Sequence, residues 1–121
     1  MILADTTIWV DHLACVDVDL ARLLNLGDVL GHPFVTAEIA LGSLANRDAT
    51  VALLDSLPQA QSASQPELMQ LISSEHLGGV GIGFVDAHLL AACRLAGSAL
   101  WTRDKRLRAQ AQRLGLAWSP G

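Results

Sequence analysis

The segment MILADTTIWVDHL, residues 1–13, opens with a short apolar run, Met1–Ala4, that ends at Asp5. This order predicts a buried strand followed by a helix or turn over residues 6–13. The same order, an apolar run and then a helical pattern, recurs along the chain. Strands that alternate with helices indicate a parallel sheet with helices on both faces. We therefore expect an α/β domain with three layers, α/β/α, around a central, mainly parallel sheet.

The other expected elements follow from apolar periodicity and from the glycines that end helices. Further strands are expected at Val29–Val35, 59–63, Ala99–Thr102 and Leu116–Trp118. The expected helices cover Asp19–Leu26, Thr36–Asn46, Asp48–Leu57, Gln65–Leu77, Phe84–Ala96 and Asp104–Leu114. Ligand sites in such sheets lie beyond the carboxyl ends of the strands, so residues there are the first candidates for function.

Length and composition favour one domain, residues 1–121, with 51% hydrophobic and 17% charged residues. A chain this apolar is not expected to be disordered. Its longest segment without a charged residue, Ser56–Pro66, is too short to span a membrane. Cys15 and Cys93 lie far apart and fit a reduced protein better than a disulfide framework. We expect a cytoplasmic protein without a membrane segment.

The net charge of −4 argues at first against a nucleic-acid partner. The charges are, however, unevenly distributed along the chain. Residues 1–93 carry eleven acids and two bases, a net charge of −9, whereas residues 94–121 carry six bases and one acid, a net charge of +5. The lone acid of this basic segment is Asp104, and its role needs an explanation.

Three acids fall where an expected strand passes into an expected helix. Asp5 directly follows the first strand, and Asp104 follows the strand Ala99–Thr102 with one residue between. Glu38 is expected in the first turn of the helix after Val29–Val35. Because parallel strands end at the same edge of a sheet, these three carboxylates are expected to lie on one edge.

Asp86 is a fourth acid in an unusual place. On the expected helix Phe84–Ala96 its neighbours three, four and seven positions on are Leu89, Leu90 and Cys93. An ionised carboxylate on that apolar stripe is costly unless it is paired or bound to a cation. An ion pair within the helix is excluded, because the nearest base, Arg94, is about 12 Å away along the axis.

Each acid taken alone has a structural explanation. Asp5 and Asp104 are both suited to cap the N-terminus of the helix that follows them. Glu38 would be favoured by the positive end of its helix. Four carboxylates on one edge, however, repel one another and raise one another's pKa values, which disfavours folding unless a cation lies among them. Carboxylate oxygens suit Mg²⁺, for which Mn²⁺ can substitute.

Four segments of the chain resemble PIN-domain ribonucleases, and within them the VapC toxins of toxin–antitoxin pairs. The segments, each of which carries one of the acids, are MILADTTIWVDHL, HPFVTAEIALGSL, GIGFVDAHLLAA and LWTRDKRL. The resemblance implies a PIN-like fold and a Mg²⁺-dependent endoribonuclease that hydrolyses phosphodiesters in RNA. It implies that the catalytic and metal-binding residues are Asp5, Glu38, Asp86 and Asp104. Many relatives carry a further acid where this chain has Arg106, so a fifth acidic ligand is not expected.

The resemblance also suggests supporting residues and partners. Thr6 and Thr102 match hydroxyl residues beside the first and last acids, and would support a carboxylate. Arg103 and Lys105, which flank Asp104, are expected to contact RNA phosphates. The implied partners are a VapB-like antitoxin that covers the active site and a second copy of the chain in a homodimer.

Two other functions remain open at this point. A phospho-accepting receiver domain shares the size and an acid after a strand, but it needs adjacent acids there, and this chain offers only Asp5. Labelling of Asp5 by acetyl phosphate would favour that function. A non-catalytic partner-binding module with a degenerate site is the second alternative, and failure to bind Mn²⁺ would favour it.

Overall fold

Three short parallel strands form the centre of the computed structural model, which describes residues 1–121. β1 (Ile2–Ala4) lies between β2 (Val29–Leu30) and β3 (Ala99–Trp101) and pairs in parallel with both. In the register of the sheet, Leu3 is opposite Leu30 on one side and Leu100 on the other. The expected parallel sheet is therefore confirmed, with the strand order β2-β1-β3.

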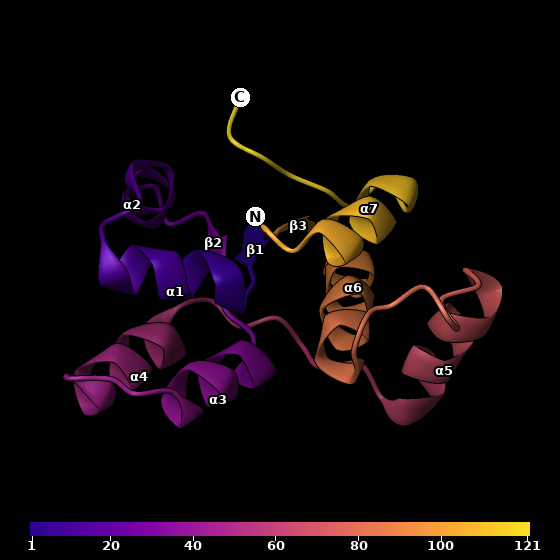
Figure 1. The fold of residues 1–121 in the computed structure, drawn as a ribbon, viewed down its shortest axis with the longest axis horizontal. Coiled ribbons are helices and arrows are strands. Elements are labelled where there is room, and N and C mark those ends of the chain that lie inside the picture. Colours follow the sequence, from indigo (N-terminus) through magenta and orange to yellow (C-terminus); the bar gives the residue numbers. More distant parts are fainter.

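Seven helices surround this sheet. They are α1 (Thr6–Ala14), α2 (Val18–Asn25), α3 (Pro33–Leu41), α4 (Arg47–Ser56), α5 (Gln65–Ser74), α6 (Phe84–Ala96) and α7 (Lys105–Arg113). In Figure 1, α1 to α4 gather on one side of the strands and α5 to α7 on the other. This arrangement is the three-layer α/β/α fold that the alternation of strands and helices predicts.

The segment Val29–Val35 differs from its prediction as a strand. Only Val29 and Leu30 pair with β1, and α3 already begins at Pro33. Proline has no backbone N–H and a fixed φ, which suits the first turn of a helix, and His32 caps that turn through Phe34 N–H at 3.0 Å. α3 also ends five residues earlier than expected, at Leu41.

Two other expected strands are reduced to single bridges. In the segment 59–63 only Gln59 pairs, with Gly31, and in Leu116–Trp118 only Ala117 pairs, with Leu100. Ser64 begins a capping box for α5, so the chain turns away from the sheet after residue 63. The last segment is followed by Pro120, which has no N–H to extend a ladder. The sheet consequently keeps three strands.

The hydrophobic core is one cluster of 27 buried residues that spans both faces of the sheet. α6 is the most deeply buried helix, since every residue from Ala87 to Cys93 is buried. Trp9 and Trp101 are also buried in the core. No helix has the length and apolar character that a membrane crossing requires.

Candidate active site

Asp5 lies at the end of β1 and is held by hydrogen bonds on both carboxylate oxygens. Its Oδ1 accepts from the backbone N–H of Ile8 at 3.3 Å, so Asp5 caps α1, and Oδ1 also accepts from the Thr7 hydroxyl. Its Oδ2 accepts from the Thr102 hydroxyl. Asp5 is only 4% exposed. Burial raises the pKa of Asp5, while the hydrogen bonds from Thr102 and Thr7 act in the opposite direction.

Asp104 is tied to Asp5 through Thr102. The Thr102 hydroxyl, which donates to Asp5, accepts from the backbone N–H of Asp104 at 3.1 Å. The strands β1 and β3 that precede the two acids are hydrogen-bonded neighbours, so both acids lie at the same edge of the sheet. Asp104 also caps α7, because its Oδ1 accepts from Leu107 N–H at 2.9 Å.

Asp86 lies in the first turn of α6, where it is partly buried. Its Oδ2 accepts from the backbone N–H of Gly83 at 3.2 Å, so it also stabilises the start of its helix, a local role that its place on the apolar stripe does not suggest. Burial is the largest cause that raises the pKa of Asp86, and the charges of Asp104 and Glu38 raise it further. The structure therefore brings Asp86 within electrostatic reach of these two acids.

Glu38 differs from its sequence-based placement. Because α3 begins at Pro33, Glu38 is in the second turn of that helix and not in the first, and it is exposed to solvent. The Thr6 hydroxyl donates to Glu38 Oε1 at 2.6 Å and links the start of α1 to α3. The Thr6 hydroxyl thus contacts the carboxylate of Glu38 and not that of the adjacent Asp5.

Thr7 is a residue that sequence reasoning left out of the site. Its hydroxyl donates to Asp5 Oδ1 and accepts from the backbone N–H of Arg103 at 3.0 Å. The signal that could have found it is the position two residues after a helix-capping aspartate, where a hydroxyl can reach the capping carboxylate.

All four acids would offer carboxylate oxygens as metal ligands, and such oxygens fit a hard divalent cation. No group of three or more His, Cys, Asp and Glu side chains stands ready to hold a metal ion in this structure. Mg²⁺, however, is usually bound through one or two protein carboxylates, with water and substrate phosphate as its other ligands. Burial of Asp86 and the charges of Asp104 and Glu38 disfavour its ionised carboxylate, and a cation beside it would relieve that unfavourable interaction.

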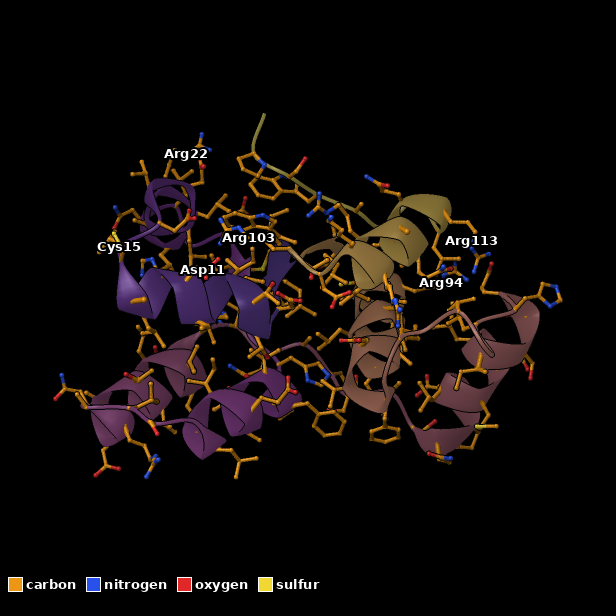
Figure 2. All side chains as sticks on the ribbon, in the orientation of Figure 1. Asp11, Cys15, Arg22, Arg94, Arg103 and Arg113 are labelled. Atoms are coloured by element: carbon orange, nitrogen blue, oxygen red, sulfur yellow. The ribbon has the colours of Figure 1, made fainter.

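The two basic residues beside Asp104 differ in their surroundings. Arg103 forms ion pairs with Asp11 at 2.8 Å and with Asp17 at 2.6 Å, so its guanidinium is already engaged. Figure 2 shows Arg103 beside α1, close to Asp11. Lys105 is exposed and has no carboxylate within ion-pair distance in the structure.

An apolar groove of about 410 Å³ adjoins Glu38 between α1 and the end of α3. Glu38 is its only charged lining residue, and the others are Val10, Leu13, Ala14, Ile39, Gly42, Ser43, Leu44 and Ala45. A second groove lies between α5 and α6, and none of the candidate site residues lines it.

Comparison with known proteins decides the family. The chain is 43% identical to ribonuclease VapC32 from two strains of Mycobacterium tuberculosis, over 118 residues that cover 97% of this chain and 95% of each relative. The chain belongs to the VapC family of PIN-domain ribonucleases. No family model matches the chain. The resemblance carried by the four acidic segments is thereby confirmed at the level of the family.

The fold of this VapC chain also has a counterpart among solved structures. The crystal structure of PAE2754 from Pyrobaculum aerophilum matches with a TM-score of 0.62 and 16% sequence identity, over 90% of this chain and 83% of that one. At this identity the likeness concerns the fold alone. It agrees with the three-layer, PIN-like architecture.

Proposed function

We propose that this VapC chain is a metal-dependent endoribonuclease that acts as the toxin of a toxin–antitoxin pair. The observation that carries the proposal is the 43% identity, over nearly the whole chain, to proteins named ribonuclease VapC32. The site geometry supports it, because carboxylates from β1, α3, α6 and the β3–α7 junction lie around one end of the sheet.

We assign Asp5, Glu38, Asp86 and Asp104 to the catalytic, metal-binding site, with Mg²⁺ as the cation and Mn²⁺ as its substitute. When bound, the cation would lower the pKa of the attacking water and neutralise charge at the phosphate. Asp5 offers a rigid carboxylate, since Thr7 and Thr102 fix its two oxygens. Glu38 is exposed to solvent, so it is better placed than the buried Asp5 to orient the attacking water.

RNA binding is assigned to Lys105, the basic residue that directly follows Asp104. Lys105 is the first residue of α7, its side chain is exposed, and its charge is not neutralised by a carboxylate. The Lys105 ammonium group is therefore available to bind an RNA phosphate that lies beside the carboxylates. Arg103 was predicted from its position to make a similar contact, but its guanidinium is paired with Asp11 and Asp17.

A VapB-like antitoxin is the proposed protein partner, and its segment is proposed to lie in the apolar groove beside Glu38. Two features support this choice. The groove is lined mainly by apolar side chains, and it shares Glu38 with the candidate site. A segment with an apolar face and a basic side chain would therefore cover the site and pair with its carboxylates.

We further propose that the chain forms a homodimer and acts in the cytoplasm, as VapC membership suggests. Both cysteines are free thiols, which agrees with a reducing compartment. Light scattering of the purified chain tests the dimer, for which twice the chain mass of 12.8 kDa is expected.

The proposed activity is tested by metal removal combined with one substitution. Purified protein is incubated with total RNA in Mg²⁺, in EDTA, and in EDTA followed by excess Mn²⁺, and the new RNA ends are sequenced. We expect discrete cleavage sites that disappear in EDTA and return with Mn²⁺. Asp5→Asn should abolish them, whereas Asp55→Asn, an exposed acid in α4, should not. Cleavage that persists in EDTA would contradict metal dependence.

A further inference from the structure

Arg103 joins three elements of the fold around the candidate site. It follows β3 by two residues, and its guanidinium pairs with Asp11 in α1 and with Asp17, the residue that caps α2. Its Cζ also lies 5.5 Å from the centre of the Trp101 ring, which favours the same inward orientation. The side chain of Arg103 therefore lies along the protein surface against α1 and α2, with 37% of it exposed.

The ion pairs of Arg103 use the forked geometry of the guanidinium. Nη1 contacts Asp11 and Nη2 contacts Asp17, so two carboxylates from different helices are held by one planar group. A lysine ammonium could satisfy one of them well but cannot present two fixed nitrogens. The side chain of Asp17 is 15% exposed, so its ion pair with Arg103 is better shielded from solvent than the pair of Arg103 with Asp11.

The backbone of Arg103 connects this arrangement to the catalytic carboxylate. Arg103 N–H donates to the Thr7 hydroxyl at 3.0 Å, and that hydroxyl donates to Asp5 Oδ1. Thr7 and Asp11 are four residues apart in α1 and therefore lie on the same face of the helix. Arg103 thus contacts that face twice, through its backbone at Thr7 and through its side chain at Asp11.

We propose that Arg103 is a positioning residue, which fixes Thr7 and through it the Asp5 carboxylate, and does not act by contacting RNA. The proposal rests on the proposed ribonuclease function, because it assigns how one carboxylate of that site is held. Misplacement of a reacting group by about 1 Å can lower a rate by about 100-fold, so a fixed orientation of Asp5 matters for the chemical step.

A positioning role and an RNA-binding role for Arg103 predict opposite effects when Asp11 and Asp17 are neutralised. If Arg103 positions Thr7, loss of its partners loosens the site and lowers kcat. If Arg103 binds phosphate, the same change frees the guanidinium, removes two negative charges and lowers KM. The double variant Asp11→Asn/Asp17→Asn distinguishes the two, and Asn at position 17 retains the ability to cap α2.

The experiment measures kcat and KM on an RNA oligonucleotide that the wild-type protein cleaves in Mg²⁺. For Asp11→Asn/Asp17→Asn and for Arg103→Met we expect kcat to fall about tenfold or more, with KM changed less than about threefold. Arg103→Lys should restore only part of the loss. Arg22→Met, which breaks an exposed ion pair with Asp19 in α2, is the matched control and should leave both constants unchanged. A lower KM with unchanged kcat in the double variant would overturn the proposal.

A second readout does not depend on RNA cleavage. Amide hydrogen exchange of Arg103 is followed in metal-free protein without RNA, since this N–H donates to Thr7. We expect exchange to be about tenfold faster in the double variant than in the wild type and in Arg22→Met. Unchanged exchange would overturn the proposal even if wild-type protein cleaves RNA. Faster exchange in the double variant, combined with a wild-type protein that cleaves no RNA, would instead support the positioning role and contradict the proposed function.

Discussion

The Thr102 hydroxyl donates a hydrogen bond to Asp5 Oδ2, although the two residues are 97 positions apart in the chain. Both side chains are buried, and Thr102 also accepts from the N–H of Asp104. One hydroxyl therefore links the acid after β1 to the acid after β3. The contact depends on the parallel pairing of those strands, so the fold and the candidate site are stabilised by the same interaction.

Replacement of Thr102 by valine tests this link. Valine keeps the shape of threonine but leaves Asp5 Oδ2 and the Asp104 N–H without their partner, at a cost of about 1–3 kcal/mol in the free energy of unfolding. RNA cleavage should fall as well, because Asp5 loses its orientation. Thr102→Ser keeps the hydroxyl and should lose less than about 1 kcal/mol. Urea unfolding measures both variants, and Thr50→Val in α4 is the control, since the Thr50 hydroxyl makes no hydrogen bond.

The burial of Asp86, together with the nearby charges of Asp104 and Glu38, predicts a pH dependence of stability in metal-free protein. Because its pKa is raised above 3.8, the folded state binds the Asp86 proton more tightly than the unfolded state does. That stabilisation is present below pH 3.8 and is lost as the pH rises through the folded-state pKa. Asp86→Asn retains an oxygen for Gly83 N–H and should therefore be more stable than the wild type at pH 7 in EDTA.

The same variant tests whether Asp86 binds a cation. Thermal unfolding of both proteins is measured from pH 3 to pH 7, and the advantage of Asp86→Asn should shrink towards the acid end. Addition of Mg²⁺ at pH 7 should raise the Tm of the wild type more than that of Asp86→Asn, because binding to the native state stabilises it. An equal Mg²⁺ effect on the two proteins would argue against Asp86 as a ligand.

Much of the site could be predicted from the sequence, since its position follows from local patterns. Asp5 directly follows one apolar run and Asp104 comes soon after another, so both acids are placed at the carboxyl end of the sheet once those runs are identified as neighbouring strands. Asp86 stands out as an acid among apolar helical neighbours. Glu38 was placed less well, because the sequence around Pro33 is compatible with an edge strand as well as with a helix start.

Tertiary contacts of single side chains could not be predicted in the same way. A basic residue at the junction after β3 can point towards substrate or back into the fold. The direction of Arg103 depends on Asp11 and Asp17, which lie more than 80 positions away. The distant partner of a threonine hydroxyl is equally hidden, so the contact of Thr6 with Glu38 appears only when α1 and α3 are packed together.

Lys105 is expected to contribute to RNA binding through charge alone. Binding is measured in the Asp5→Asn background, where RNA is not cleaved, at several salt concentrations. Lys105→Met should weaken binding at low salt and reduce the slope of log Kd against log salt by about 0.7, the value for one phosphate contact on a single strand. Arg22→Met should leave the slope unchanged. A slope that also stays constant in Lys105→Met would place the RNA elsewhere.

Gly81 lies in the loop that leads to Asp86, and its backbone requires glycine. Its φ is +86°, and an added Cβ would lie 2.9 Å from Cδ of Arg106. Gly81→Ala should lower the free energy of unfolding by about 1–2 kcal/mol from the backbone conformation alone. The double variant with Arg106→Ala removes the side-chain contact and should still be destabilised. Gly78→Ala, with an ordinary φ and open space, is the control and should differ from wild type by less than about 1 kcal/mol.

The central claim is that the four carboxylates form the catalytic site for RNA cleavage, and Asp86→Asn tests it most directly. The substitution retains the side-chain shape and an acceptor for Gly83 N–H, so a loss of activity reports the lost charge. Initial cleavage rates in Mg²⁺ are compared for wild type, Asp86→Asn and Asp55→Asn. We predict a rate at least about 100-fold below wild type for Asp86→Asn and an unchanged rate for Asp55→Asn. Cleavage by Asp86→Asn at the wild-type rate would contradict the account.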